Sequence, residues 1–380
     1  MKALSRLDMS PLSRWFWSVD RLGLAIVAII AALGVTLLFA AGPSASLQYK
    51  IDDRFHYPLR QILFLAPAFL VMIGVSMLSP LQARRLGVLL FALALAAMAA
   101  TVTFGAEING ARRWLSLGPI SFQPSEFAKP GFVVFAAWFL AEARRTPGFP
   151  GAPIAFGLYL LFIVLLVNEP DYGQAALVTM VWATMLFVAG GAWIWMGGLV
   201  GVGAAALAFG YMFSPHIAKR VSAFLDPESG ADTFQVDRAL QAIREGGAFG
   251  SLADGADVKY KLPDAHTDFI FSVAGEEHGF ILCAVIIALY GALVLHFLRR
   301  AGSMRSLFQQ CAITGLTALF GLQAFINMAV NLRLMPAKGM TLPFISYGGS
   351  SLLAMGLVFG LILAFSRSPG RAFRRKEIMP

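Results

Sequence analysis

The sequence predicts an all-α polytopic membrane protein, a bundle of about ten transmembrane helices. Of its 380 residues 58% are hydrophobic and only 13% are charged, and the mean hydropathy is +0.71. These values do not fit a soluble globular protein. Apolar runs long enough to cross roughly 30 Å of hydrocarbon recur along the whole chain. The pattern excludes a soluble enzyme with one anchor, a β-barrel with alternating ten-residue segments, and a disordered chain.

Ten apolar stretches have the length expected of membrane spans, about 17 to 25 residues. They cover 22–42, 59–79, 85–104, 124–142, 151–167, 173–190, 192–213, 269–297, 306–330 and 349–366. Between spans seven and eight the sequence predicts a long loop at 214–268, and a loop of that length in a compact bundle is usually functional. We expect one membrane domain over 1–380, with spans one to seven within 22–213, spans eight to ten within 269–366, and tails at 1–21 and 367–380.

Basic residues predict the orientation of the bundle. The amino-terminal tail is basic, and no clear small-residue cleavage site follows the first span, so this span is expected to be a retained signal anchor. Arginine pairs also occur at 84–85, 144–145 and 299–300, in predicted inner loops. Both termini are therefore expected to be cytoplasmic and the 214–268 loop periplasmic. The formal net charge of +9 follows from this placement and predicts no nucleic-acid partner.

Charged residues concentrate in four predicted outer segments, although a desolvated charge costs several kcal/mol unless it finds a partner. In the first segment Pro124 suits the first turn of a helix, which places Glu126 and Lys129 on one face as an ion pair. Arg113 precedes Trp114, so a cation lies beside an aromatic ring at the membrane interface. An aromatic belt with snorkelling arginines would give the same pattern.

The second and third segments carry most of the carboxylates. Glu169 and Asp171 lie in a predicted tight turn between spans five and six, and turn chemistry alone explains much of that segment. Asp264, His266 and Asp268 lie together where the long loop enters the eighth span. Asp268 could cap that helix or act as a chemical base, and the residues alone leave both interpretations open.

The fourth segment combines Lys338 with a Gly-Gly-Ser-Ser run that contains Ser350 and opens the last span. Free N–H groups at such a helix start could receive a phosphate, although glycine is also a plain helix breaker. Arg113, Lys129 and Lys338 as cations, with Asp268 as a base, fit a lipid-linked pyrophosphate handled at the outer membrane face. No histidine or cysteine spacing supports a metal site, and no phosphate-binding loop or Gly-x-Ser-x-Gly motif supports nucleotide or ester hydrolysis.

Four strings in order resemble the SEDS family (shape, elongation, division and sporulation): NGARRWLSLGPISFQPSEFAKP, EPDYGQAAL, LPDAHTDFIFSVAGEEHGF and LMPAKGMTLPFISYGGSS. The resemblance runs from about residue 20 to 366, and AHTDFIF with Lys338 favours the cell-division branch over the rod-shape branch. Two features depart from the family pattern. Glu169 replaces a frequent glutamine, and the 250–255 stretch lacks the usual alternation of glycines.

The resemblance implies a peptidoglycan glycosyltransferase that polymerises lipid II at the periplasmic face of the bacterial inner membrane during septal cell-wall synthesis. It implies that undecaprenyl pyrophosphate is released, and that the partners are a class B penicillin-binding protein, a transpeptidase, and other divisome membrane proteins. The family's essential loop aspartate matches Asp268. The resemblance and the residue patterns together give the expected substrate-binding residues: Arg113, Trp114, Glu126, Lys129, His266, Lys338 and Ser350.

The expected reaction is an inverting glycosyl transfer in which Asp268 takes the proton from the 4-hydroxyl of the acceptor sugar. That oxygen attacks the anomeric carbon of the growing strand, and the lipid diphosphate leaves. No soluble cofactor is needed, although a divalent cation, Mg²⁺ or Mn²⁺, could assist. Two alternatives stay open. A lipid II flippase would need polar groups through the full depth of a cavity, and a non-catalytic recruiter of the penicillin-binding protein would not need Asp268.

Overall fold

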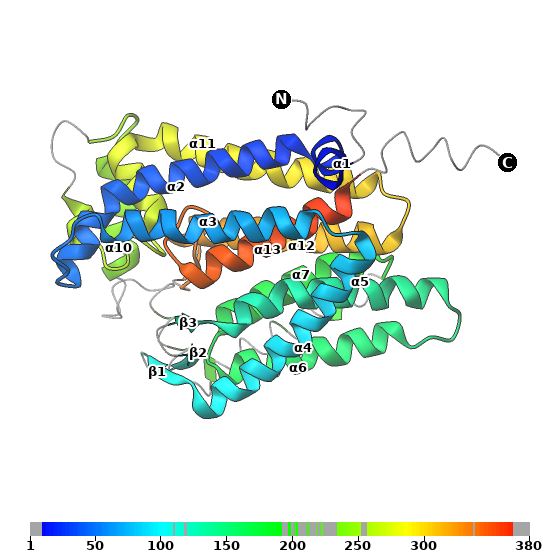
Figure 1. Cartoon of the computed structure of the whole chain (residues 1–380). Helices are drawn as coiled ribbons and strands as arrows, with labels where there is room; N and C mark the ends of the chain where they lie inside the picture. The colour runs from blue at the N-terminus through cyan, green and yellow to red at the C-terminus, as the bar shows by residue number, and fades with distance from the viewer. Residues whose placement is uncertain are drawn as a thin grey trace.

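The computed structural model describes residues 10–108, 111–117, 120–191, 234–251, 257–336 and 339–367, with isolated positions between 192 and 233. Its helices run largely side by side (Figure 1). They are α1 (Pro11–Ser18), α2 (Arg21–Gln48), α3 (His56–Ser76), α4 (Pro80–Phe104), α5 (Pro124–Arg145), α6 (Gly151–Asn168), α7 (Tyr172–Val188), α10 (Phe234–Glu245), α11 (Ile270–Gly302), α12 (Leu307–Asn331) and α13 (Gly349–Ser366).

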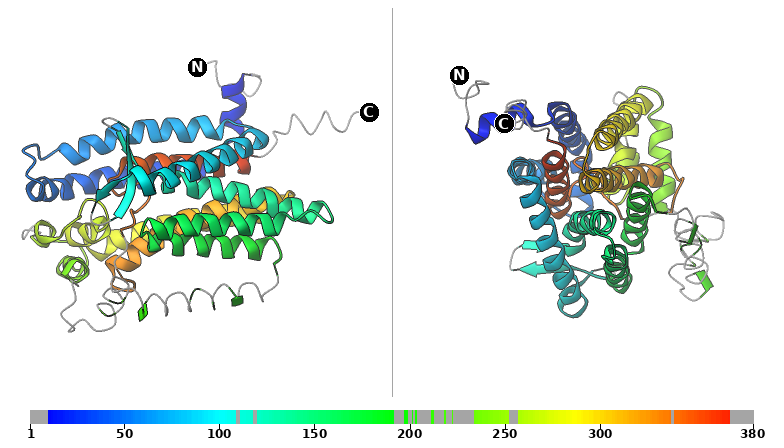
Figure 2. Two further views of the ribbon diagram at one scale, coloured as in Figure 1. Left: turned by 90° about the horizontal axis from the view of Figure 1, so that it is seen from below. Right: turned by 90° about the vertical axis from the view of Figure 1, so that its right-hand side faces the viewer.

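The helical bundle confirms the predicted fold class. Seven helices are long and apolar enough to cross a membrane, namely α2, α3, α4, α6, α11, α12 and α13. The apolar helix α7 and the partly polar α5 coincide with two further predicted spans. The span expected at 192–213 lies outside the described residues. Short α1 lies across the end of the bundle rather than along it (Figure 2).

Two helices form the centre of the bundle. In the most apolar stretches of α12 and α13, 78% and 83% of the residues are buried, compared with 28–39% in the other five membrane-length helices. Helix α12 packs against α5, α7, α11 and α13. Because lipid can cover apolar side chains as well as protein can, only these two helices need an environment made almost wholly of protein. Polar side chains on α12 must therefore find partners inside the bundle.

A small antiparallel sheet occupies the loop between α4 and α5, where hydropathy predicted no regular structure. Its strands are β1 (Ala106–Ile108), β2 (Ala111–Leu117) and β3 (Ile120–Phe122), with β2 in the centre. Helix α4 and helix α5 both contact β2. The sheet thus fixes the position of Arg113 and Trp114, which lie on β2, at one end of the bundle (Figure 1).

The predicted long loop also contains structure. Helix α10 and a 3-10 turn, η2 (Val258–Lys261), pack on the start of α11. Glu276 of α11 accepts hydrogen bonds from the backbone N–H groups of Val258 at 2.7 Å and Lys259 at 2.9 Å, while Glu277 pairs with the Lys259 ammonium. Both acids on this part of α11 therefore have partners, as a buried charge requires.

Helix α11 is broken at Gly279, which has a φ of 75°. The N–H of the next residue, Phe280, donates to the carbonyl oxygen of Gly247 at 2.8 Å, so the loop after α10 satisfies a donor that the break releases. A Cβ at Gly279 would lie 2.3 Å from the carbonyl oxygen of Ala248. Both the backbone conformation and the close approach require glycine here.

Candidate functional site

Asp268 lies in the turn before α11 and faces a small pocket with room for about 40 Å³ of solvent, enough for a few water molecules. The pocket walls come from α10, the entry to α11, the end of α12 and the segment before α13. Its lining residues are Gln235, Asp268, Phe269, Asn327, Val330, Gly339 and Met340. Residues far apart in sequence therefore meet around one carboxylate.

The Asp268 carboxylate does not cap α11. The N-cap position belongs to Phe269, which has no side-chain capping bond. Across the described parts of the chain, no group donates a hydrogen bond to either carboxylate oxygen of Asp268. Burial, and then the negative charge of Asp264, raise the pKa of Asp268 to about 7. The described residues thus present an acid without a hydrogen-bond donor, whose pKa lies near neutral pH.

Two asparagines of α12 hold the backbone of Asp268. The carbonyl oxygen of Asp268 accepts hydrogen bonds from Asn327 Nδ2 at 2.8 Å and from Asn331 Nδ2 at 2.9 Å. Both amides are buried, with 2% and 0% exposure. Sequence reasoning did not select them. The available signal was the spacing of three amides, Gln323, Asn327 and Asn331, which places them on one face of an otherwise apolar span.

The predicted ion pair between Glu126 and Lys129 is confirmed, but it lies inside the bundle. Lys129 Nζ is 2.8 Å from Glu126 Oε1, 2.9 Å from Gln174 Oε1 and 3.1 Å from Gln323 Oε1. Lys129 is 1% exposed and Glu126 is 4% exposed. An ammonium has three donors, and all three are used. In this structure Lys129 is therefore not an open cation at the outer face, because the first turns of α5 face α7 and α12.

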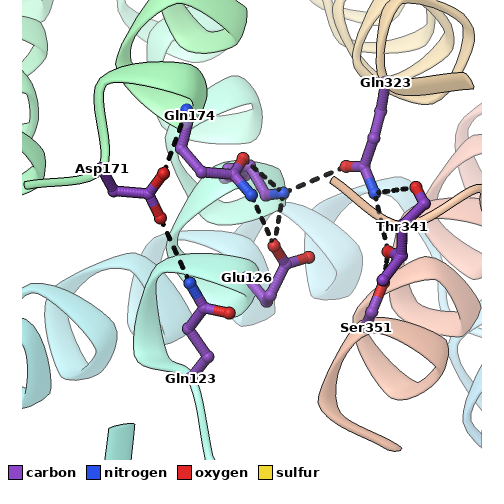
Figure 3. A network of polar contacts seen from close by, with 8 residues as sticks. Gln123, Glu126, Asp171, Gln174, Gln323, Thr341 and Ser351 are labelled. Atoms are coloured by element: carbon purple, nitrogen blue, oxygen red, sulfur yellow. Dashed lines mark hydrogen bonds and ion pairs between the residues drawn. The ribbon is translucent and has the colours of Figure 1, made fainter. Parts of the chain in front are cut away.

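The same network extends to the last span (Figure 3). Gln323 Nε2 donates to the Thr341 carbonyl oxygen at 3.1 Å, and Thr341 Oγ1 lies 2.6 Å from Ser351 Oγ. The first turn of α13 is thus connected to α12 through Ser351, whereas the neighbouring Ser350 is buried in that turn. Polar contacts join α5, α7, α12 and α13 at one level of the bundle.

Arg113 binds protein rather than open solvent. Its Nε donates to the carbonyl oxygen of Glu169 at 2.9 Å, and its Nη2 donates to that of Pro170 at 2.5 Å. The cation thereby fixes the turn between α6 and α7, where Asp171 caps α7 by accepting from the Gln174 N–H at 3.4 Å. The neighbouring Trp114 is partly buried on β2. The guanidinium supports a turn of the backbone, and its predicted contact with substrate stays a prediction.

Glu169 is a buried acid with unusual surroundings. Its side chain is 1% exposed, and neither carboxylate oxygen has a hydrogen-bond partner among the described residues. Burial and the charge of Asp171 outweigh the Arg113 guanidinium and raise the pKa of Glu169 to about 8. At neutral pH the group is therefore a neutral acid, which resembles in shape and charge the glutamine expected at this position.

His266 belongs to an aromatic cluster beside the Asp268 turn. Its ring centroid lies 4.2 Å from that of Tyr57, 5.7 Å from that of Tyr347 and 5.8 Å from that of Tyr49. Burial lowers the pKa of His266 to about 4, so the imidazole is neutral. The His266 carbonyl oxygen also accepts the Tyr347 N–H at 2.9 Å. This residue supports the shape of the turn, and the residues that line the pocket do not include it.

Lys338 lies outside the described residues, but its neighbour Gly339 lines the pocket. A Cβ built on Gly339 would lie 3.6 Å from Asp268 Oδ2, so this backbone passes directly beside the carboxylate. Where the chain is described, no group of three or more His, Cys, Asp or Glu side chains is arranged to hold a metal ion. We derive no chemical step through a divalent cation.

Comparison with known proteins identifies the family. The family model described as "Cell cycle protein", for FtsW, RodA and SpoVE, matches residues 20–369. A protein of Caulobacter vibrioides, "Probable peptidoglycan glycosyltransferase FtsW", is 43% identical over 369 residues, covering 97% of this chain and 94% of the relative. A protein of the same name from Saccharophagus degradans is 37% identical and covers 90% and 92%. The cell-division branch of the family, expected from the sequence, is therefore the one these relatives represent.

Solved structures agree with the sequence relatives. A chain from a structure described as "Structural coordination of polymerization and crosslinking by a peptidoglycan synthase complex" is 32% identical, with a TM-score of 0.78 and coverage of 93% of this chain and 99% of that one. The rod shape determining protein RodA of Thermus thermophilus is 30% identical, with a TM-score of 0.69 and coverage of 92% and 96%. This chain belongs to the FtsW/RodA/SpoVE family of cell cycle proteins, the SEDS family.

Proposed function

We propose that this chain is a peptidoglycan glycosyltransferase that polymerises lipid II at the outer face of the bacterial inner membrane. The observation that carries the proposal is the carboxylate of Asp268. It has no hydrogen-bond donor among the described residues, it faces a pocket, and its pKa is raised to about 7. A general base works best when its pKa lies near the working pH. The names of the FtsW relatives support the same reaction.

Asp268 acts as the base in this proposal. It removes the proton from the 4-hydroxyl of the acceptor sugar on lipid II while that oxygen forms a bond to the anomeric carbon of the growing strand. The bond from that carbon to the diphosphate breaks, undecaprenyl pyrophosphate leaves with the electron pair, and the anomeric configuration inverts. Asp268 then returns its proton to solvent. No redox step or soluble cofactor is required, because the activated bond arrives with the substrate.

The predicted substrate-binding residues divide into two groups in this proposal. Lys338 meets the diphosphate charge, since its neighbour Gly339 lies beside Asp268. Arg113 and Lys129 act at a distance: the first holds the turn between α6 and α7, and the second joins α5 to α12. Trp114, Glu126, His266 and Ser350 contribute by supporting these elements, because three of them are buried and Trp114 is partly buried.

The proposed setting is the division septum. The chain forms one domain over 1–380 with both termini in the cytoplasm and the 214–268 loop in the periplasm, as the basic residues predict. A class B penicillin-binding protein crosslinks the strands that this chain makes, alongside other divisome membrane proteins. The likeness to a chain of a peptidoglycan synthase complex, in which polymerization and crosslinking are coordinated, supports a transpeptidase partner.

Strand synthesis by purified protein tests the proposal. The full chain is reconstituted with fluorescent lipid II, with and without the penicillin-binding partner, and wild type is compared with Asp268→Asn and Asp268→Ala. We expect strand formation to fall by at least about 100-fold in both variants, with unchanged thermal stability. Wild-type polymerisation by the variants would contradict the role of Asp268. Lipid II transport without any strand from wild type would favour a flippase, and partner binding alone would favour a recruiter.

A further inference from the structure

Two walls of the Asp268 pocket meet at one side chain. One wall is the turn that carries Asp268, and the other is the Gly339–Met340 segment that leads to α13. Asn327 of α12 lies between them. Its single amide nitrogen donates to the Asp268 carbonyl oxygen at 2.8 Å and to the Met340 carbonyl oxygen at 2.6 Å. Each hydrogen of the amide thus holds one wall.

The arrangement leaves little freedom on either side of the pocket. The Asp268 carbonyl has two lone pairs, and Asn327 and Asn331 occupy both. On the other wall, Gly339 lies so close to the Asp268 carboxylate that a Cβ on Gly339 would lie 3.6 Å from Asp268 Oδ2. Because Asn327 is buried at 2% exposure, water cannot readily replace its two bonds. The separation of the two walls therefore depends on this amide.

Building on the proposed function, we propose that Asn327 is a positioning residue for glycosyl transfer, whose amide sets the distance between the Asp268 carboxylate and the Gly339–Met340 segment. Asn327 does not contact the reacting atoms. It aligns the base on one wall with the Gly339–Met340 backbone on the other. A displacement of about 1 Å in such an alignment can cost about 100-fold in rate.

Asn331 provides a matched control on the same face of α12. Its Nδ2 also donates to the Asp268 carbonyl oxygen, and its Oδ1 accepts from the N–H and the hydroxyl of Ser272 at 3.1 and 2.7 Å. Its Nδ2 also donates to the Asn327 carbonyl oxygen at 2.9 Å, so the two residues are in contact. Asn331 therefore makes at least as many hydrogen bonds as Asn327, but none of them is to Met340. If these amides served stability alone, loss of Asn331 would be at least as harmful as loss of Asn327.

The test compares Asn327→Leu, Asn327→Asp and Asn331→Leu in the full chain, reconstituted with fluorescent lipid II and the penicillin-binding partner. Leucine preserves the approximate size and removes both donors, while an ionised aspartate would face two carbonyl oxygens. We expect kcat to fall about 10- to 100-fold in both Asn327 variants, with KM changed less than threefold. Asn331→Leu removes one bond to the Asp268 carbonyl but leaves the bond between Asn327 and Met340, so it should lower kcat less than Asn327→Leu does, although its melting temperature falls as far or further.

A pH profile separates positioning from stability. Among the described residues, Asp264 is the acid whose charge raises the pKa of Asp268, and Tyr49 is a titratable neighbour of both; none of the three is altered in these variants. Opening the pocket hydrates Asp268, so the acid limb of the kcat profile should move to lower pH in Asn327→Leu but not in Asn331→Leu.

Equal kcat loss in the Asn327 and Asn331 variants, with an unshifted pH profile, would overturn the inference while leaving the proposed function intact. If Asn327→Leu does not fold, the kcat and pH profile of the near-isosteric Asn327→Asp are compared with those of Asn331→Leu instead. An Asp268→Asn control run in parallel identifies the other failure: if it polymerises like wild type, the proposed function fails and the positioning role fails with it.

Discussion

Two polar regions of this bundle differ in how fully their charges are paired. Around Lys129 every donor of the ammonium has an acceptor, from Glu126, Gln174 and Gln323. Around Asp268 the carboxylate has no described hydrogen-bond partner and a pKa raised to about 7. The ammonium of Lys129 is fully satisfied, although Glu126 Oε2 has no hydrogen-bond partner among the described residues. A buried polar network of this kind rigidifies a structure, whereas an acid in a pocket with no described partner is a candidate for accepting a proton. The difference supports a structural role for the first region and the proposed catalytic role for the second.

One helix connects the two regions. Gln323 belongs to the Lys129 network, and Asn327 lines the Asp268 pocket. The two residues are one turn apart on α12. Polar side chains at this spacing lie on the same face of a helix. A change in the network can thus reach the pocket through the position of α12, and also through Thr341, the residue after Met340, which accepts a hydrogen bond from Gln323. Stability and strand synthesis are therefore measured separately for variants of each region.

The largest stability effect is expected for Lys129→Met. It leaves the Glu126 carboxylate buried without its cation, and breaking a buried pair costs about 3–5 kcal/mol. We expect a strongly reduced thermal midpoint for the purified protein in detergent. The double variant Glu126→Gln with Lys129→Met should recover much of the loss. Wild-type stability of the single variant would contradict the structural role of the network.

The next effect concerns strand synthesis. Lys338→Ala should lower polymerisation by about 10-fold or more, because in the proposed function this cation offsets the charge of the departing diphosphate. Lys50→Ala is the control, since Lys50 is exposed in the loop between α2 and α3. The assay compares initial rates with fluorescent lipid II at equal amounts of folded protein. Equal losses in the two variants would count against a diphosphate site beside Gly339.

A pH-dependent stability effect is expected at Glu169. Its pKa of about 8 lies above the ordinary value of 4.5, so the folded protein retains a proton that the unfolded chain loses as pH rises. The stability contributed by this protonation is complete below pH 4.5 and is lost as pH rises toward 8, by about 1.4 kcal/mol for each unit of pKa shift. Glu169→Gln should therefore match wild type at acidic pH and be more stable at alkaline pH. Parallel thermal midpoints for the two proteins at all pH values would show that Glu169 is not a buried neutral acid.

Much of the fold followed from the sequence, because membrane spans are set by apolar length and basic flanks. The spacing of Glu126 and Lys129 likewise predicted their ion pair, since it depends only on helix geometry. The depth of that pair was not predictable, because it depends on how α5 packs against α7 and α12. For the same reason Arg113 was expected to meet substrate, whereas its partners are two backbone carbonyls 56 and 57 residues away.

The amides of α12 show a second limit. Asn327 and Asn331 interrupt an apolar span and have no charge, so a search for charged groups near the membrane passed over them. Their importance appears only when the Asp268 turn and Met340 are placed against them. The small sheet and α10 were missed because the strands are short and α10 is partly polar, so a search for long apolar runs carries no signal for either.

The pH dependence of strand synthesis tests the role of Asp268 most directly. A general base acts only when deprotonated, so kcat/KM for wild type should rise with pH and reach half its maximum near pH 7. Asp264→Asn removes the like charge that helps to raise the pKa of Asp268, and it should shift this acid limb to lower pH. A profile that is flat between about pH 5 and 9, or one that Asp264→Asn leaves in place, would contradict catalysis by this carboxylate.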